Sequence, residues 1–188
     1  MQGLGSIIAV ALPLSVRALE HKLHQSNYRY LIFVGGEELA PTQMKSFYTL
    51  GVLLPLLAFA ESLFHAGPSP ERIVTVGIYG FAAALLLRLW VVWMLRSRWT
   101  MRCVAVPGWK PCTVGPYRFI NNPEYVSRLL EGLSICAYFA AYNVGAVFAL
   151  TYCISCSRIM QIERRQLDEL SGASCAPGSI GSAIPSSR

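Results

Sequence analysis

The stretch that decides the fold is residues 114–167, VGPYRFINNPEYVSRLLEGLSICAYFAAYNVGAVFALTYCISCSRIMQIERRQL. It begins with a polar, turn-rich loop, in which Gly115-Pro116 and Asn122-Pro123 break regular structure. A long, mostly apolar segment with a break near Tyr142-Asn143 follows, and a charged helix end closes it. Polar clusters at both ends of membrane-length helices predict a site at a membrane surface that meets a lipid-like partner.

The composition indicates a membrane protein. Hydrophobic residues make up 54% of the 188 residues and charged residues only 14%, which is too apolar for an ordinary soluble domain. The net charge of +6 comes from arginines at the ends of apolar runs, so it indicates membrane topology and no nucleic-acid partner. Cys153-x-x-Cys156 has no histidine or second cysteine pair nearby, and we predict no metal site.

The apolar segments predict an all-α, polytopic membrane protein with about five transmembrane or hairpin helices in one domain, residues 1–170. The expected helices are a short first span at 2–16, spans at 46–65 and 73–95, and a hairpin of two helices at 125–140 and 143–160. Residues 66–72 are expected to form a tight turn. Residues 171–188 are small and polar, and we expect a disordered tail.

The polar segment 17–45 has two interpretations. Apolar residues recur at roughly helical spacing, which predicts an interfacial helix that ends at Gly35-Gly36, with a new segment beginning at Pro41. These residues are Leu19, Leu23, Tyr30, Leu31 and Val34. The alternative is a plain connector. His21 and His24 share one helix face, which we expect to be a solvated polar face.

The distribution of basic residues predicts the topology. Segments 17–45 and 96–128 are rich in arginine and lysine, so the positive-inside rule places them on the cytoplasmic side and the 66–72 turn on the other. The protein is therefore expected in the inner, cytoplasmic membrane. The returning 125–160 hairpin would bring both polar motifs to the cytoplasmic side, where a soluble cosubstrate can reach them.

Three charged residues, Glu61, Arg88 and Glu131, fall inside apolar helices. A lone charge there costs several kcal/mol, so each is expected to be paired or to face a polar cavity. One interpretation is that Arg88 and Glu131 bind the substrate in an acceptor pocket. The other is a structural ion pair between helices, or snorkelling for Glu61 and Arg88.

The motifs in this region resemble those of the isoprenylcysteine carboxyl methyltransferase family of integral membrane methyltransferases. The resemblance lies in GPYR at 115–118, Asn122-Pro-x-Tyr125, a helix containing Glu131, and Arg158 followed by Glu163. It implies methyl transfer from S-adenosylmethionine to a lipophilic acceptor, either a carboxylate or a phenolic hydroxyl of a prenyl or long-chain lipid. The implied cofactor-binding residues are Gly115, Tyr117, Arg118, Asn122, Pro123, Tyr125, Arg158 and Glu163.

The same resemblance implies catalytic roles for Arg158 and Glu163. Arg158 would hold the cofactor carboxylate, and Glu163 its amino group or ribose. Without the resemblance, these two residues would be a charged cluster at a membrane exit, and the loop aromatics would be headgroup anchors.

Two positions depart from the family pattern. Asn121-Asn122 stands where the family usually has Arg-His, and Ile162 stands where it commonly has an acid. Asn122 cannot act as a base near neutral pH. The alternatives to an enzyme are therefore a catalytically degenerate, lipid-binding homologue and a small membrane scaffold or transporter, for which Arg88 and Glu131 would be intramembrane substrate residues.

Overall fold

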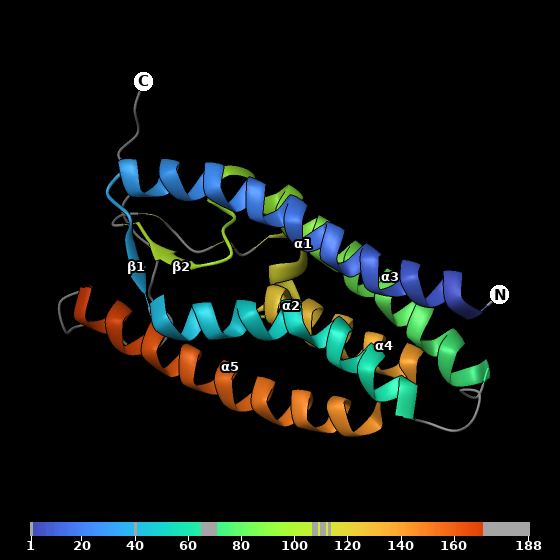
Figure 1. The fold of residues 1–188 in the computed structure, drawn as a ribbon. Helices are drawn as coiled ribbons and strands as arrows, with labels where there is room; N and C mark the ends of the chain where they lie inside the picture. Colours follow the sequence, from blue (N-terminus) through green and yellow to red (C-terminus); the bar gives the residue numbers. More distant parts are fainter. Residues whose placement is uncertain are drawn as a thin grey trace.

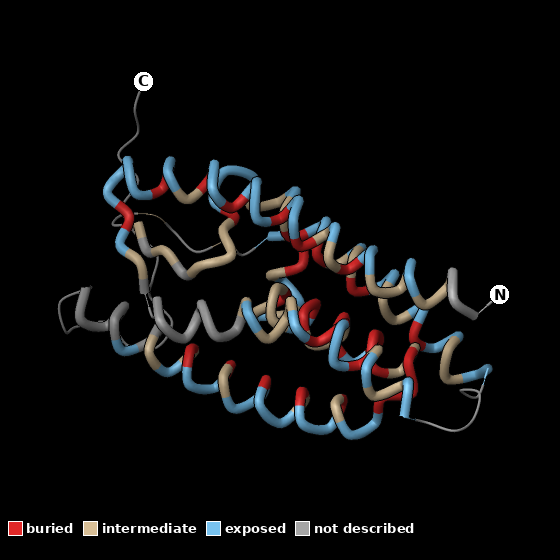
Figure 2. Tube along the Cα trace, in the orientation of Figure 1, coloured by how far each residue is buried: buried red, intermediate tan, exposed pale blue. Residues whose placement is uncertain are grey.

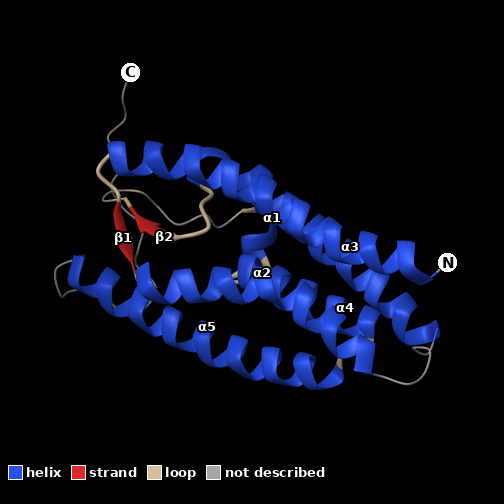
Figure 3. Cartoon of the chain, viewed as in Figure 1, coloured by secondary structure: helices blue, strands red, loops and turns tan. Residues whose placement is uncertain are grey.

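The structure is a computed structural model, and it describes residues 2–39, 41–64, 71–106, 109, 112 and 114–170. Within these residues, five long helices and two short strands follow one another along the chain (Figure 1 and Figure 3). Their bounds are α1 (Gln2–Phe33), β1 (Glu37–Leu39), α2 (Pro41–Phe64), α3 (Glu71–Leu95), β2 (Cys103–Ala105), the 3-10 turns η1 (Arg96–Arg98) and η2 (Gly115–Arg118), α4 (Pro123–Phe139) and α5 (Tyr142–Leu170). Most of the predicted 66–72 turn and the predicted tail at 171–188 lie outside the described residues.

The first helix differs from the sequence-based prediction. A short span followed by a separate interfacial helix was expected, but α1 is one continuous helix that contains Pro13. Its buried face carries polar side chains at three- and four-residue spacing, namely Arg17, Glu20, His24 and Asn27, while Leu19 and Leu23 point outward. Of the apolar residues whose spacing predicted a helix here, Leu31 is buried, whereas Leu19, Leu23, Tyr30 and Val34 are exposed.

Two helices are long and apolar enough to cross a membrane: residues Glu71–Arg98, including α3, and Tyr142–Ile162 of α5. Only 17% and 28% of their most apolar windows are buried, whereas the core helix of a soluble protein is mostly buried. Large apolar side chains of α1, among them Ile7, Ile8 and Leu19, are exposed, and Figure 2 shows exposed residues in pale blue along this helix. The helical fold with five helices is as predicted, but only two of these helices qualify as membrane spans among the described residues, so the predicted transmembrane count is not confirmed.

The predicted helical hairpin is confirmed as α4 and α5. The break lies at Ala140-Ala141, two residues before the expected position, because Ala140 adopts a left-handed conformation with φ 51° and ends α4. Helix α4 lies at the centre of the molecule and packs against α2, α3 and α5. Residues of α4 therefore contact three other helices.

Glu61 is not a lone intramembrane charge, because it is hydrogen-bonded to the start of α5. Its carboxylate accepts hydrogen bonds from the backbone N–H of Asn143 at 3.1 Å and of Val144 at 2.8 Å, and from the Asn143 side chain at 2.9 Å. These are the first N–H groups of α5, which have no partner within the helix. The negative charge also interacts favourably with the positive end of the α5 dipole. Glu61 thus joins the end of α2 to the start of α5.

Replacing Glu61 with alanine is expected to lower the free energy of unfolding by about 1–2 kcal/mol, since three hydrogen bonds to a helix N-terminus are lost. Unfolding of the purified protein in mixed micelles measures this change. Glu61→Gln keeps a carbonyl oxygen as acceptor, so it should lose less. Equal stability of the alanine variant and the wild type would contradict the capping role.

The all-α prediction missed one small element. Strands β1 and β2 pair antiparallel, with Glu38 opposite Val104, and join the segment after α1 to the segment after α3. Each strand has three residues, which is too short for an alternating pattern to be recognised in the sequence. The pairing brings these two loops together at the end of the molecule where the sequence predicts the cytoplasmic site.

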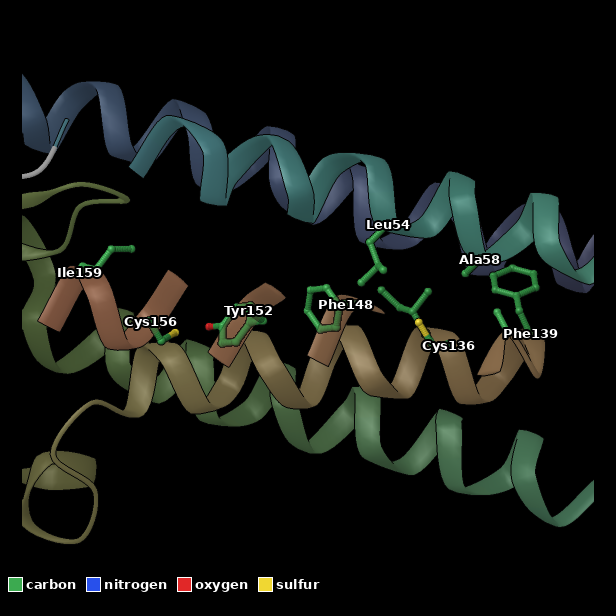
Figure 4. Close-up of a cluster of buried hydrophobic side chains, with 10 residues drawn as sticks. Leu54, Ala58, Cys136, Phe139, Phe148, Tyr152, Cys156 and Ile159 are labelled. Atoms are coloured by element: carbon green, nitrogen blue, oxygen red, sulfur yellow. The ribbon is translucent and has the colours of Figure 1, made fainter. Parts of the chain in front are cut away.

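The apolar core lies between α2, α4 and α5 (Figure 4). The largest group of buried side chains comes from these three helices: Leu54 and Ala58 of α2, Cys136 and Phe139 of α4, and Phe148, Tyr152, Cys156 and Ile159 of α5. The Phe148 and Tyr152 rings lie 5.3 Å apart between centroids. This packing fixes α5 against α4, while the other side of α4 holds charged residues.

Candidate functional site

Four charged side chains from three helices form a buried cluster, which we call the charge network. Its members are Arg17 and Glu20 of α1, Arg88 of α3 and Glu131 of α4, each less than one-tenth exposed. Glu131 Oε2 accepts a hydrogen bond from Arg17 Nη2 at 2.8 Å and forms an ion pair with Arg88 Nη1 at 2.7 Å. Glu20 accepts from Arg17 Nη1 and Arg88 Nη1, both at 3.0 Å. The two positive and two negative charges sum to zero, which limits the cost of burying them.

Arg88 keeps one side of its guanidinium without a partner. Its Nη1 serves both carboxylates, but Nε and Nη2 make no hydrogen bond to any group that the structure describes. A water-sized hollow of about 10 Å³ lies beside the network, lined by Arg17, Arg128 and Glu131 among others. Buried donors without partners are costly, and Arg88 itself is not among the described residues that line this hollow.

A second ion pair connects the charge network to the start of α4. Arg128 Nε donates to Glu124 Oε1 at 2.8 Å, Arg128 Nη2 forms an ion pair with the same oxygen at 2.7 Å, and Trp99 Nε1 donates to Glu124 Oε2 at 3.1 Å. Burial opposes ionisation of Glu124, but Arg128 and then Arg88 outweigh it and lower the pKa of this carboxyl group. Glu124 therefore remains ionised at neutral pH.

The loop containing GPYR rests on the end of α3. Gly115 has φ +63°, a conformation that disfavours other residues, and a Cβ atom at this position would lie 3.0 Å from the Met94 side chain. Pro116 follows in the first turn of η2 and is buried. Glycine at 115 thus permits both the turn and its close approach to α3.

The start of α4 is joined to the middle of α5. The Asn122 side-chain amide donates to the sulfur of Met160 at 3.1 Å, and the Tyr152 hydroxyl donates to the backbone oxygen of Tyr125 at 2.7 Å. Between these contacts, Ile159 is fully buried. The structure therefore brings two of the predicted cofactor residues, Asn122 and Tyr125, against the helix that carries Arg158.

The other predicted cofactor residues are less enclosed. Pro123 begins α4 and is buried, Tyr117 is half-buried, and Arg118 and Arg158 are exposed. Burial and then the nearby Glu124 charge raise the pKa of the Tyr117 hydroxyl, so it stays protonated and can donate a hydrogen bond. The Glu163 side chain lies outside the described residues. An exposed arginine such as Arg158 is free to hold a carboxylate bidentately.

The second half of α1 holds the loop that follows α3. Asn27 Nδ2 donates to the backbone oxygens of Arg96 at 3.0 Å and Trp99 at 2.7 Å, and the Met101 N–H donates to His24 Nδ1 at 3.3 Å. His24 is therefore buried, and the predicted solvated face is wrong for this residue. Burial, followed by the Arg102 charge, lowers the pKa of His24 to about 4, so its ring is neutral at pH 7.

An apolar cavity of about 300 Å³ lies between α1, α3 and α4. Its lining is almost entirely aliphatic or aromatic, and its polar groups are the hydroxyls of Ser134 and Tyr138. The lining residues are Gly5, Ile8, Ala9, Leu12, Pro13, Gly77, Ile78, Phe81, Ser134, Ile135, Tyr138 and Phe139. Ile135 also lines the water-sized hollow beside the charge network. The cavity and the network are therefore neighbours along α4, and its volume is at the lower limit for a small-molecule site.

The sequence-based analysis found Arg88 and Glu131 but missed Arg17 and Glu20. The structure confirms that Arg88 and Glu131 are paired with each other, one of the two alternatives considered, and adds both α1 residues to the pair. The missed signal was the spacing Arg17, Glu20, His24, Asn27, which repeats every three or four residues. Such a polar stripe in a membrane helix indicates an inward face.

Comparisons with known proteins agree with the motifs. A family model described as the isoprenylcysteine carboxyl methyltransferase (ICMT) family matches residues 71–168, from the start of α3 to near the end of α5. The uncharacterized protein YpbQ of Bacillus subtilis (strain 168) is 25% identical over 169 residues, which cover 87% of this chain and 97% of YpbQ. No solved structure matches. Arg17 and Glu20 lie outside the region that the family model matches.

Proposed function

Because this chain belongs to the isoprenylcysteine carboxyl methyltransferase family, we propose that it is a membrane-embedded, S-adenosylmethionine-dependent O-methyltransferase that acts on a lipophilic acceptor. Membership of the family suggests a membrane methyltransferase. The cosubstrate, the acceptor and the residue roles are the proposal. The observation that carries it is the contact between the Asn122 amide and Met160, which places the GPYR–NPEY loop beside the end of α5.

The methyl donor would bind at this junction, on the cytoplasmic side of the inner membrane. Exposed Arg158 would hold its carboxylate, and Glu163 its amino group or ribose. The protonated Tyr117 hydroxyl, the Tyr125 ring and the Asn122 amide would shape the pocket, and aromatic faces favour a sulfonium. Catalysis would consist mainly of positioning, since methyl transfer is a direct displacement at carbon.

The acceptor would bind between α1, α3 and α4. Arg88 and Glu131 would lie at its polar head, and its apolar tail would occupy the cavity lined by Ile8, Leu12 and Phe81. Supporting this arrangement, the cavity is apolar and adjoins the charge network through Ile135. A lipid acceptor could reach it from the bilayer, while the soluble methyl donor reaches the loop from the cytoplasm.

Binding of S-adenosylmethionine tests the proposal. Calorimetry on the detergent-purified protein is expected to give a Kd between about 1 μM and 1 mM. Arg158→Ala should weaken binding about tenfold to a hundredfold, since it removes a charge-assisted hydrogen bond. Arg165→Ala, an exposed arginine further along α5, is the matched control and should leave the affinity unchanged. Equal affinities of the Arg158 variant and the wild type would remove Arg158 from the cofactor site.

A degenerate, lipid-binding homologue is the second candidate, and Asn121-Asn122 and Ile162 favour it. The Asn122→His variant separates the two candidates. If the wild type does not bind S-adenosylmethionine and the variant does, the chain has a methyltransferase fold that has lost its activity. If the wild type binds it, the remaining question is the acceptor.

A further inference from the structure

Exposed arginines and aromatic side chains form a band around the end of α3, which we call the basic collar. Its members are Trp90, Trp93, Arg96, Arg98, Arg118 and Phe119, and each of them is exposed. They lie at one end of the molecule, because Gly115, which begins η2, closely approaches the Met94 side chain of α3. The collar therefore joins the end of α3 to the loop that contains GPYR.

The collar carries an excess of positive charge. Residues 90–119 contain no aspartate or glutamate, and two acids that contact this segment are already paired. Glu38 binds Arg102 at 2.8 Å. Glu124 binds Arg128 at 2.7 Å. Within the part of the chain that the structure describes, none of the three collar arginines forms an ion pair.

The turn that presents Arg96 and Arg98 is held by the interior of the protein. Arg96 has φ 49°, a left-handed conformation that is uncommon for a residue with a side chain. Asn27 Nδ2 fixes this turn by donating to the backbone oxygens of Arg96 at 3.0 Å and Trp99 at 2.7 Å. The Arg98 guanidinium lies over the Trp109 ring, 4.5 Å from its centroid. Strained backbone that its surroundings hold in place occurs mostly at functional positions, and here it keeps two arginines at the surface.

The aromatic members place the collar at the boundary of the membrane. The segment Glu71–Arg98 is one of the two helices long and apolar enough to cross a membrane, and the collar surrounds its last two turns. Trp93 is 65% exposed and Phe119 is 76% exposed, although both side chains are large and aromatic. Tryptophan next to arginine at the end of such a helix is typical of the headgroup region. Lipid headgroups are therefore the partners that lie closest to the collar arginines.

We propose that the basic collar binds anionic phospholipids, with their headgroups at Arg96 and Arg98 and their acyl chains along the exposed face of α3. Charge complementarity selects this partner, because the ammonium group of a zwitterionic headgroup offsets the attraction of its phosphate to a guanidinium. Each arginine near an anionic surface strengthens binding about fivefold. The inference goes beyond the proposed function and depends on neither the methyl donor nor the acceptor.

Tryptophan fluorescence measures this binding at the collar itself, because all four tryptophans of the chain lie between Trp90 and Trp109. The purified protein is reconstituted in vesicles of phosphatidylcholine and phosphatidylglycerol, and bromine atoms on the acyl chains of one of the two lipids quench the tryptophans that this lipid contacts. At about 0.1 M salt, phosphatidylglycerol is expected to be preferred about fivefold or more. At about 1 M salt the preference should disappear, since the Debye length falls from about 10 Å to about 3 Å.

The double variant Arg96→Gln with Arg98→Gln identifies the residues responsible. Glutamine removes both charges from exposed positions, so the preference for phosphatidylglycerol should fall at least fivefold. Arg118 is kept, because the family resemblance also implies it in the cofactor site. Arg72→Gln changes an exposed arginine at the opposite end of α3, and this matched control should keep the wild-type preference.

Three results would overturn the proposal. Equal quenching by the two brominated lipids in the wild type would show that the collar does not distinguish their headgroups. A preference that persists at about 1 M salt would show that charge does not cause it. An equal loss in Arg72→Gln and in the double variant would show that net charge, and not the collar, determines the preference. The salt series uses the wild-type protein, so it tests the proposal even if the double variant does not fold.

Discussion

Replacing Glu131 with leucine is expected to lower the free energy of unfolding by about 3–5 kcal/mol, since one carboxylate oxygen neutralises two buried arginines. Glu131 Oε2 lies 2.8 Å from Arg17 Nη2 and 2.7 Å from Arg88 Nη1. Without it, Glu20 alone faces two guanidinium groups, and one buried positive charge is uncompensated. Unfolding in mixed micelles measures the loss, and Glu71→Leu at an exposed position is the control.

A double variant separates charge balance from packing. Arg17→Met combined with Glu131→Leu removes one charge of each sign and leaves Arg88 paired with Glu20 at 3.0 Å. This double variant is expected to be more stable than Glu131→Leu alone, because the remaining pair is balanced. Destabilisation equal to the sum of the two single variants would show that the four residues do not act as one network.

The sequence predicted the helices around the site well because their signals are local. Gly35-Gly36 ends α1 as expected, Pro41 and Pro123 begin α2 and α4 as helix-starting prolines do, and the 125–160 hairpin lies where its apolar content placed it. The family resemblance implied a single site built from this loop and the last helix, and Asn122 contacts Met160 of α5. The sequence alone could not predict which side of α1 is buried.

Which side of α1 is buried depends on partner residues far away in the chain. Leu19 is 67% exposed while Arg17 is 6% exposed, which reverses the arrangement expected of a helix on a soluble core. Arg17 is buried only because Glu131, 114 residues later, lies opposite it. The hydrophobic pattern of α1 contains no information about that residue. For the same reason, β1 and β2 could not be recognised before their pairing across the two loops was known.

The second large effect is expected at Gly77, which sets the distance between α3 and α4. A Cβ atom at this position would lie 2.7 Å from the backbone nitrogen of Tyr138 and 2.8 Å from the backbone oxygen of Ser134. Backbone atoms of a helix cannot rotate away as a side chain can. Gly77→Val is therefore expected to destabilise the protein by about 3 kcal/mol or more, at the upper end of overpacking effects, because the two helices must separate.

The same variant should also impair function. Arg88 lies eleven residues after Gly77, or about three helical turns and roughly 16 Å along α3, so both residues face α4. Separating the helices at Gly77 lengthens the 2.7 Å contact between Arg88 and Glu131. It also disturbs the apolar cavity between α1, α3 and α4, which Gly77 lines. Ala83, six residues further along the same helix, is exposed, and Ala83→Val adds a similar volume on the exposed side of α3. The free energy of unfolding in micelles and the S-adenosylmethionine-dependent methylation of a lipophilic acceptor should therefore both fall in Gly77→Val and be unchanged in Ala83→Val. A Gly77→Val protein with wild-type stability would show that α3 and α4 do not need this close approach.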